Sequence, residues 1–250
     1  MDKDNLLICL KHNPKAKVKL ICFPYAGGGV SFFRKWVKEI PDYFEIYSIS
    51  LPGRENKLKD VSYENYLPLV QDISKNIISQ LKDDRLIFFG HSLGAIISFE
   101  VSHFLMKHYQ KLPLILFASS CKAPHFFIEN NPLGRLSNDE LIIKLKEING
   151  TPKEIFENKD LLDFFLPIIR SDLKICDSYQ FSHRVKLNCP ITVLGGLEDQ
   201  IQVKYLEYWK ELTDQTFQIQ LFKGDHFYLV ENEKNVINTI IKSVIIQNRG

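Results

Sequence analysis

The sequence lacks the cysteine and apolar patterns of disulfide-rich, zinc-binding and membrane-spanning proteins. Its five cysteines are odd in number and no two form a CxxC pair, so neither a disulfide framework nor a metal site is indicated. No apolar run is long enough to span a membrane, and Leu6–Leu10 is too short for the hydrophobic region of a signal peptide. We therefore expect a cytoplasmic protein with no metal ion and no membrane association.

A basic stripe is also missing. The chain has 250 residues, with 32 Lys and Arg interspersed among 30 Asp and Glu, and its one Lys-rich stretch, Lys11–Lys19, is short. This pattern argues against a nucleic-acid partner. Repeats and low-complexity linkers are absent as well, and the 45% of hydrophobic residues is ordinary for a globular protein. The length fits one α/β domain with an insertion, or two small domains.

What the sequence does contain is an alternation of short apolar runs with longer helical patterns. The runs predicted as strands are Val18–Phe23, Phe44–Ser50, Leu86–Phe89, Leu114–Ala118, Ile191–Leu194 and Phe217–Phe222. The predicted helices are Ser31–Ile40, Tyr63–Leu81, Leu93–Tyr109, Lys204–Leu212 and Asn232–Ile246. Because strands alternate with helices and central runs are apolar throughout, we expect a mostly parallel sheet covered by helices on both faces.

The alternation stops in residues 120–188, where helix signals replace strand signals. Ser137-Asn-Asp-Glu140 has the spacing of a capping box, and Thr151-Pro-Lys-Glu154 has the same spacing with proline at the first helical position. We therefore expect one domain made of a core and a helical insertion. The core is predicted to comprise residues 1–119 and 189–250, and the insertion about 120–188.

A long apolar segment, Asp160–Tyr179, makes this insertion a candidate lid, because ligands bind over the carboxyl end of an α/β sheet. The segment contains Phe164 and Phe165, which we predict to line an acyl pocket. It also contains Pro167, which lacks a backbone donor and should bend or break the helix at a hinge. The alternative is that these helices are an ordinary part of the core.

Gly90-His91-Ser92-Leu93-Gly94 matches the G-x-S-x-G motif of a nucleophilic serine. It follows a predicted strand and opens a predicted helix, which is the context that gives the motif its meaning. In this sharp turn the positions two residues from the serine must lack side chains, so that strand and helix can approach closely. The turn exposes the hydroxyl, and the helix N-terminus behind it favours developing negative charge. Ser92 is therefore the predicted nucleophile.

A serine hydroxyl needs a base, and in this arrangement the chain order is Ser, then Asp or Glu, then His. Of the seven histidines, only His226 follows the last predicted strand. The acid should follow an earlier strand, and Ile191–Leu194 leads into a loop that holds Glu198 and Asp199. We prefer Asp199 as the acid that orients the imidazole, with Glu198 as the alternative. Asp225, next to the base, should point elsewhere.

An oxyanion hole needs two backbone N–H donors. One should be Leu93, directly after the nucleophile. The other should come from the loop after the first predicted strand, Phe23-Pro-Tyr-Ala-Gly-Gly-Gly29, in which glycines let the backbone approach a ligand. This loop lacks the lysine of a P-loop and the spacing of a dinucleotide-binding loop, which excludes a nucleotide site.

Taken together, these segments resemble the type II thioesterases that accompany non-ribosomal peptide and polyketide synthases, a family of the α/β-hydrolase fold. The resemblance covers nearly the whole chain. It rests on Phe23-Pro-Tyr-Ala-Gly-Gly28, Leu51-Pro-Gly-Arg54, Gly90-His-Ser-Leu-Gly94, Gly150-Thr-Pro152, Leu166-Pro-Ile-Ile-Arg-Ser-Asp172 and Gly224-Asp-His-Phe227. G-H-S-x-G is shared with many hydrolases, whereas the first, second and fifth of these segments are more particular to this family.

The resemblance implies a stand-alone enzyme that hydrolyses acyl groups from the phosphopantetheine arm of carrier proteins and so clears stalled or misprimed assembly lines. Carried over by position, Ser92, Asp199 and His226 form the triad, and Ala26 and Leu93 are the oxyanion donors. Beside these residues, the candidate substrate-binding residues are Tyr25, Gly27, Phe227, Phe164 and Phe165. The enzyme itself needs no cofactor, since the phosphopantetheine belongs to the acyl or peptidyl carrier protein.

Three other functions fit the same triad. An esterase or lipase would act on a free small ester, an acyltransferase would use an amine or alcohol in place of water, and a non-catalytic member would only bind carrier domains. The ratio of hydrolysis rates on acylated carrier protein and on free acyl ester tests the first, and product identity decides the second. An intact triad argues against the third.

Overall fold

The chain folds around a seven-stranded sheet in the computed structural model, which describes residues 5–82, 84–126, 132–149, 151, 153–182 and 185–247. The strand order is β1-β3-β2-β4-β5-β6-β7. The strands are β1 (Leu7–Lys11), β2 (Val18–Phe23), β3 (Phe44–Ile49), β4 (Leu86–His91), β5 (Leu116–Ser119), β6 (Ile191–Gly196) and β7 (Phe217–Phe222). Strands β2 to β7 pair in parallel, so all their carboxyl ends meet at one edge of the sheet.

Strand β1 was not predicted, and it is the antiparallel member of the sheet. It pairs with β3 through Leu7 opposite Ile49 and Ile8 opposite Ser48. The apolar run Leu6–Leu10, too short for the hydrophobic region of a signal peptide, supplies four of the five residues of this strand. A short edge strand depends on its neighbour for hydrogen bonds, so its own five residues carry a weak signal.

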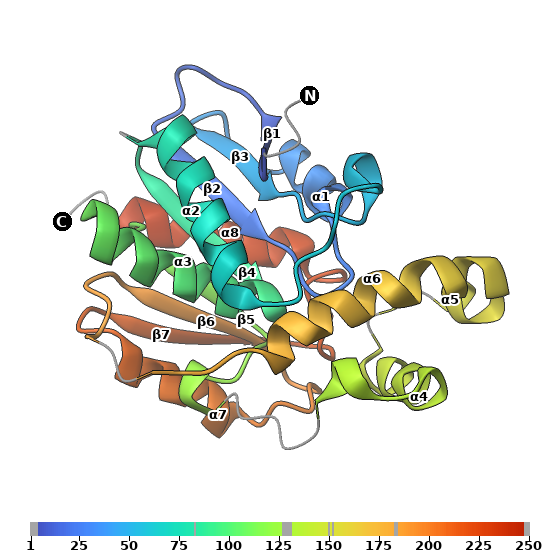
Figure 1. Ribbon diagram of the computed structural model, residues 1–250. Helices are drawn as coiled ribbons and strands as arrows, with labels where there is room; N and C mark the ends of the chain where they lie inside the picture. Colours follow the sequence, from blue (N-terminus) through green and yellow to red (C-terminus); the bar gives the residue numbers. More distant parts are fainter. Residues whose placement is uncertain are drawn as a thin grey trace.

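Helices cover both faces of the sheet, and the alternation of side chains along the central strands explains why (Figure 1). In β4, Leu86 and Phe88 pack into one core cluster with α2 (Tyr66–Leu81) and α3 (Leu93–Tyr109), while Ile87 and Phe89 pack into a second cluster on the opposite face with α8 (Glu233–Gln247). The predicted mostly parallel sheet with helices on both faces is confirmed.

Two predicted helices are each divided into two parts. The segment predicted as Ser31–Ile40 forms α1 (Val30–Phe33) followed by the 3₁₀ turn Arg34–Lys38. The segment predicted as Lys204–Leu212 forms α7 (Val203–Glu207) followed by the 3₁₀ turn Tyr208–Leu212. Each turn places a tryptophan, Trp36 or Trp209, fully inside the core. Tight 3₁₀ geometry is common at helix ends, and apolar periodicity alone does not distinguish it from an α-helix.

Between β5 and β6 the described residues form helices and turns. They are the 3₁₀ turns Pro124–Phe126 and Leu133–Arg135 and the helices α4 (Asn138–Ile148), α5 (Lys153–Glu157) and α6 (Lys159–Asp177). The capping box at Ser137 is confirmed, because its hydroxyl accepts from the Glu140 N–H and the Glu140 carboxylate accepts from the Ser137 N–H. Pro152, the first helical position of the second predicted capping box, lies outside the described residues.

Pro167 does not break its helix, contrary to the sequence prediction. Helix α6 runs through it without interruption from Lys159 to Asp177. Pro167 is exposed, as is Asp163, whose carbonyl would otherwise accept the missing i to i−4 hydrogen bond. Water can therefore satisfy that carbonyl, and the apolar face of α6 holds the helix in place.

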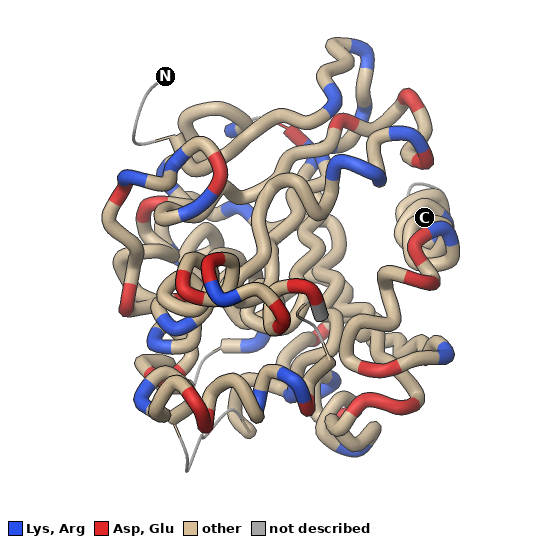
Figure 2. The backbone as a smooth tube through the Cα atoms, turned by 90° about the vertical axis from the view of Figure 1, so that its right-hand side faces the viewer, with Lys and Arg blue, Asp and Glu red and all other residues tan. Residues whose placement is uncertain are grey.

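Helix α6 crosses the carboxyl edge of the sheet, and its N-terminal half projects away from the core together with α5 (Figure 1). From the side of this projection, Lys and Arg are interspersed with Asp and Glu (Figure 2). Within the part of the chain that the structure describes, no helix is both long and apolar enough to cross a membrane.

Candidate active site

Ser92 lies on the sharp turn between β4 and α3. Its backbone has φ 54° and ψ −117°, a conformation that non-glycine residues rarely adopt. A Cβ atom on Gly94 would lie 2.1 Å from the carbonyl oxygen of Phe23, and one on Gly90 would lie 2.2 Å from that of Gly94. The two glycines therefore let the start of α3 approach both β4 and the end of β2, which is the close packing that the motif predicted.

This close approach brings the loop after β2 to the first turn of α3. Leu93 is the first residue of that helix, where an N–H group has no acceptor within the helix. Ala26 and Leu93 line the same cavity as Ser92. Their N–H groups are our candidates for the oxyanion hole, aided by the positive end of the helix dipole.

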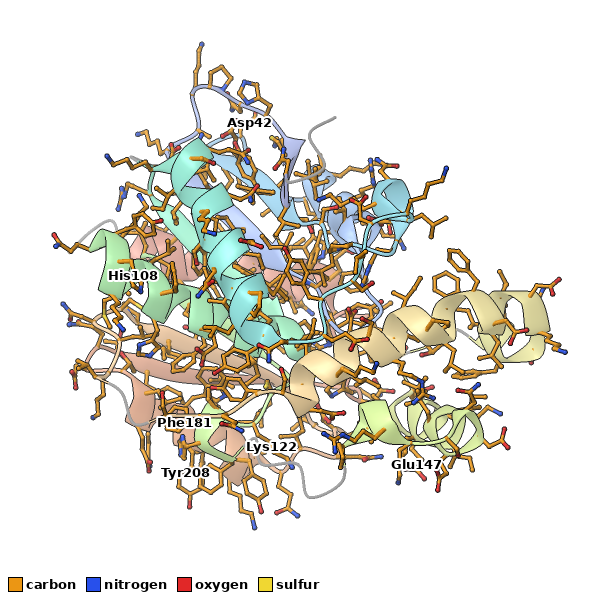
Figure 3. The ribbon with its side chains drawn as sticks, in the orientation of Figure 1. Asp42, His108, Lys122, Glu147, Phe181 and Tyr208 are labelled. Atoms are coloured by element: carbon orange, nitrogen blue, oxygen red, sulfur yellow. The ribbon has the colours of Figure 1, made fainter. Side chains whose placement is uncertain are left out.

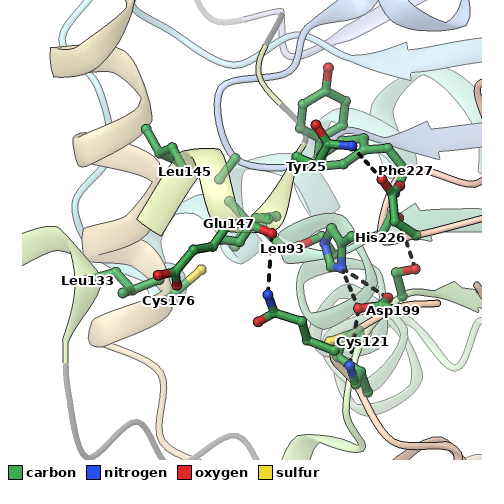
Figure 4. A pocket seen from close by; sticks show the side chains of 18 of the residues that line it. Tyr25, Leu93, Cys121, Leu133, Leu145, Glu147, Cys176, Asp199, His226 and Phe227 are labelled. Carbon is green, nitrogen blue, oxygen red and sulfur yellow. Dashed lines mark hydrogen bonds and ion pairs between the residues drawn. The ribbon is translucent and has the colours of Figure 1, made fainter. Parts of the chain in front are cut away.

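His226 and Asp199 lie side by side at the ends of β7 and β6. The Nδ1 atom of His226 lies 3.1 Å and 3.3 Å from the two carboxylate oxygens of Asp199 (Figure 4). The Asp199 side chain is almost fully buried, whereas Glu198 is exposed. Asp225 points to the insertion and accepts from the Nδ2 group of Asn149 at 2.7 Å. The geometry therefore favours Asp199 over Glu198 as the acid.

Gly196 allows the loops that carry Asp199 and His226 to meet. It was not among the predicted site residues. A Cβ atom at this position would lie 2.1 Å from the carbonyl oxygen of Asp225. Since Asp225 immediately precedes His226, any side chain on Gly196 would push the histidine loop away from Asp199. Two consecutive glycines at the end of a predicted strand were the available signal for such an approach.

The hydrogen bonds of Asp199 keep it ionised. Burial, the largest single cause, raises the pKa of its carboxyl group. The hydrogen bond and the charge of His226, together with the bond from the Ile201 N–H, lower it further than burial raises it, so the pKa lies below its usual value. The Ser120 hydroxyl donates to the carbonyl of His226 at 3.1 Å and so helps to fix the loop that carries the base. An ionised Asp199 is what a base needs to stabilise the imidazolium that forms during proton transfer.

A second histidine, His91, lies behind the base without competing with it. It is fully buried, and its ring centroid lies 5.3 Å from that of His226. Its Nδ1 atom is 2.8 Å from the Ser119 hydroxyl, which is 2.7 Å from the Tyr228 hydroxyl. Burial, reinforced by the neighbouring His226, lowers the pKa of His91 well below its usual value. The charged form of His91 is therefore disfavoured relative to an ordinary histidine.

Ser92, Asp199 and His226 open onto one cavity of about 490 Å³ between the sheet edge and the insertion (Figure 4). Its apolar lining from the insertion consists of Phe126, Leu133, Leu145, Ile148, Ile169, Leu173 and Cys176. The lining also includes polar residues, among them Glu147 on α4 and Lys122 after β5, both labelled in Figure 3. An apolar wall facing a catalytic constellation suits a substrate with an acyl chain.

Only some of the predicted substrate-binding residues line this cavity. Tyr25 and Phe227 line it, and their rings pack edge to face at 4.8 Å. Gly27 instead donates its N–H to the Asp172 carboxylate at 2.7 Å. Phe164 is 44% exposed and Phe165 packs within the insertion, and neither is a lining residue.

The insertion residues that do line the cavity were not singled out from the sequence. Leu145 comes from α4, and Ile169 and Leu173 come from α6, four residues apart on one helix face. That helical spacing was the available signal. The prediction of Phe164 and Phe165 rested on the apolar character of the segment, which does not show which helix face meets the cavity.

Comparison with known proteins decides the family. The model of the thioesterase domain family matches residues 18–244, which is nearly the whole chain. The chain belongs to the thioesterase family. As a thioesterase it is a serine hydrolase that acts on thioesters, and the sequence-based identification is confirmed.

Individual relatives match the thioesterase along almost its full length. The medium-chain S-acyl fatty acid synthase thioesterase of Homo sapiens is 36% identical, over 98% of this chain and 94% of the relative. The gramicidin S biosynthesis protein GrsT of Aneurinibacillus migulanus is 35% identical, over 93% and 91%. The solved structure of the type II thioesterase BorB from the borrelidin biosynthetic cluster aligns with a TM-score of 0.86 at 26% identity, covering 95% and 96%.

One group of side chains elsewhere in the thioesterase has the spacing of metal ligands. Within the described ranges, Cys9, His12 and Glu45 place one ligand atom each within 4.8 Å of one another. They lie at the β1–β3 edge, and the ammonium group of Lys19 already bonds the Glu45 carboxylate. The cavity lining, by contrast, holds no such trio among the residues described.

Proposed function

We propose that this thioesterase hydrolyses acyl or aminoacyl thioesters carried on the phosphopantetheine arm of carrier proteins in non-ribosomal peptide or polyketide synthesis. The observation that carries the proposal is the cavity itself. One apolar space holds a serine on a strained turn, a histidine paired with a buried carboxylate, and two helix- or loop-borne N–H groups. The proposal includes a cytoplasmic location, where such assembly lines are made.

In this mechanism Ser92 attacks the thioester carbonyl while His226 takes the hydroxyl proton. The N–H groups of Ala26 and Leu93 hold the negative charge of the tetrahedral intermediate. The carbon–sulfur bond then breaks, and the pantetheine thiol leaves with the proton from His226. A water molecule, activated by the same histidine, hydrolyses the acyl-serine and restores the free enzyme. Every group required belongs to the chain, and the pantetheine belongs to the partner.

Cys121, the cavity thiol that follows β5, is poorly suited to compete with Ser92 as a nucleophile. Cys121 also lines the cavity, but it is buried, and that burial raises the pKa of its thiol far above the usual value. A thiol that remains protonated is a poor nucleophile. The serine mechanism is therefore the one that the cavity supports.

Relatives support carrier-bound substrates of two kinds. GrsT and BorB are named for gramicidin S and borrelidin biosynthesis, and the human relative is named for fatty acid synthase. One name refers to a synthase and the other two to biosynthetic systems, which favours a tethered thioester over a free ester. We place this enzyme with the peptide and polyketide systems because of the resemblance in its Leu51–Arg54 and Leu166–Asp172 segments.

The experiment that tests the proposal compares one acyl group in three contexts. The same acyl chain is presented on a peptidyl carrier domain, on the carrier domain of a fatty acid synthase and on a free p-nitrophenyl ester. We expect kcat/KM to be highest for the peptidyl carrier. Preference for the fatty acid carrier would reassign the pathway, and a preference for the free ester would make the enzyme an esterase.

A Ser92→Ala variant is the control in each assay, together with labelling of the wild type by a fluorophosphonate. Labelled enzyme without turnover on any substrate would contradict hydrolysis and favour a binding module. Acyl transfer to an added amine in preference to water would indicate an acyltransferase.

A further inference from the structure

A buried ion pair joins the insertion to the loop that carries a candidate oxyanion donor. The Arg54 guanidinium lies 2.5 Å and 2.6 Å from the two carboxylate oxygens of Asp172 in a bidentate arrangement. The side chains are only 6% and 3% exposed, so water does not screen the interaction. Arg54 follows β3 in the core, whereas Asp172 belongs to α6 of the insertion.

Both partners also hold the backbone of the loop after β2. Asp172 accepts the N–H of Gly27 at 2.7 Å, and Arg54 donates to the carbonyl of Gly28 at 2.9 Å. Gly27 immediately follows Ala26, the candidate oxyanion donor. Four hydrogen bonds therefore connect α6, the segment after β3 and this loop within one buried unit.

Further contacts from the segment after β3 and from α6 hold this loop. Glu55, next to Arg54, accepts the N–H groups of Val30 at 3.0 Å and Ser31 at 2.8 Å. The Ile169 side chain, one turn before Asp172 on α6, lies directly against Gly27. The loop is thus held at Gly27 and Gly28 and again where it enters α1, and a side chain packs on Gly27.

We propose that Asp172 is a positioning residue for the oxyanion hole. By accepting the Gly27 N–H, Asp172 sets the direction of the neighbouring Ala26 N–H group. Because Asp172 belongs to α6 and is paired with Arg54 of the core, that direction depends on the position of α6. The geometry of the donor matters because a misplacement of about 1 Å can cost about 100-fold in rate. This inference rests on the proposed acyl-enzyme mechanism, but it does not depend on the identity of the carrier protein.

A consequence concerns movement of the insertion. The C-terminal half of α6 is tied to the core at Asp172 and, one residue earlier, by the Ser171 hydroxyl, which donates to the Tyr63 carbonyl at 3.0 Å. Displacing this half would separate the buried pair and disturb the oxyanion loop. Any opening that preserves activity therefore takes place in α4, α5 and the first half of α6.

The test uses Asp172→Asn, which keeps the shape of the side chain and removes its charge, with Ser171→Ala as the matched control. Ser171 is a buried neighbour on the same helix and ties α6 to the core, but its hydroxyl donates to Tyr63 and not to the oxyanion loop. The substrate is a small acyl thioester without a carrier, so a wrong carrier assignment does not affect the result. We expect Asp172→Asn to lower kcat by about 10- to 100-fold and to leave KM within about threefold, and Ser171→Ala to change neither by more than about threefold.

Two inhibitors distinguish positioning from a general loss of structure. A trifluoromethyl ketone forms a tetrahedral adduct on Ser92 whose oxygen occupies the oxyanion hole, whereas the thioether analogue of the substrate has no such oxygen. In Asp172→Asn the ketone should lose affinity in proportion to the fall in kcat, and the thioether should bind as in the wild type. Equal weakening of both inhibitors would overturn the proposal, and so would an unchanged kcat.

The single variant leaves Arg54 without its buried counter-charge, which can impair folding. The double variant Arg54→Gln with Asp172→Asn removes both charges and should show the same selective loss of ketone affinity. If the double variant is folded and binds the ketone normally, the pair only stabilises the fold and the proposal is wrong.

Discussion

The carboxyl edge of the sheet and the helical insertion hold their residues in the active site by different means. At the sheet edge, backbone packs on backbone: the Gly94 and Gly196 positions have no room for a Cβ atom, and they bring Ser92, Asp199 and His226 together. In the insertion, side chains make the contacts, such as Asn149 to Asp225 across the cavity mouth. Backbone contacts leave little freedom, whereas one exposed side-chain bond is easily broken. The sheet edge is therefore suited to chemistry and the insertion to substrate selection.

Helix α6 has one half that is largely exposed and one half that is packed against the core. Its N-terminal half exposes Leu161 and Phe164, whereas its C-terminal half buries Ser171, Asp172 and Ile175 against the core. The apolar segment that marked the insertion as a lid is thus rigidly attached at one end only. Five predictions test the division between the sheet edge and the insertion, in order of the expected effect.

Removal of the nucleophile should have the largest effect. Ser92→Ala should lower kcat by about 10⁴-fold or more without changing the free energy of unfolding by more than about 1 kcal/mol, because triad members act as a unit. Steady-state kinetics and chemical denaturation measure the two quantities. Activity above about a tenth of the wild type would rule out the serine mechanism.

Substitution of the predicted acid should have the second-largest effect. Asp199→Asn removes the charge that orients His226 and should lower kcat by roughly 10³–10⁴-fold. Glu198→Gln, the control on the same loop, should change kcat by less than about threefold because Glu198 is exposed. If Glu198→Gln proved the more damaging variant, the assignment of the acid would be reversed.

The pH dependence should report a single histidine. A single catalytic base gives log kcat/KM a slope of one on the acid side of the pH profile, which is tenfold for each pH unit. His91 does not add a second proton, because burial keeps its pKa well below the usual value. A slope of two on the acid side would show that both histidines titrate.

Changes to the apolar wall of the insertion should alter selectivity rather than chemistry. Leu145 lines the cavity, so Leu145→Trp should lower kcat/KM for long acyl chains by about tenfold relative to short ones. Phe164→Trp, an exposed position on the same insertion, should change this ratio by less than about twofold. A set of acyl thioesters of increasing length measures it. A larger change in this ratio for Phe164→Trp would show that Phe164 belongs to the acyl pocket after all.

The contact across the cavity mouth should have the smallest effect. Asn149→Ala removes one exposed hydrogen bond, worth about 1 kcal/mol or less, and should change kcat/KM for carrier-bound substrate by less than about fivefold. Hydrogen exchange in α4 should become faster, while exchange in residues 171–177 stays slow. Uniformly slow exchange across the insertion in both proteins would mean that the insertion is an immobile part of the core.

Much of the fold was predictable because the signals were local and repeated. The six parallel strands and the long helices have apolar patterns that few other structures satisfy, and the capping box at Ser137 depends on four consecutive residues. The short strand β1 and the uninterrupted helix through Pro167 were not predicted correctly. In both, the deciding partner lies outside the segment: β3 pairs with β1, and water reaches the face of α6 that carries Pro167.

The sequence by itself determined which residues can do the chemistry. Ser92, a histidine after the last strand and an acid after an earlier one follow from motif and chain order, because parallel strands all deliver their ends to one edge. Only the tertiary structure decided which side chains face that site. Asp199 rather than Glu198 lies against His226, Leu145 rather than Phe164 lines the cavity, and Arg54 finds Asp172 although 118 residues separate them. These choices depend on distances between elements remote in the chain, and periodicity within one element does not encode them.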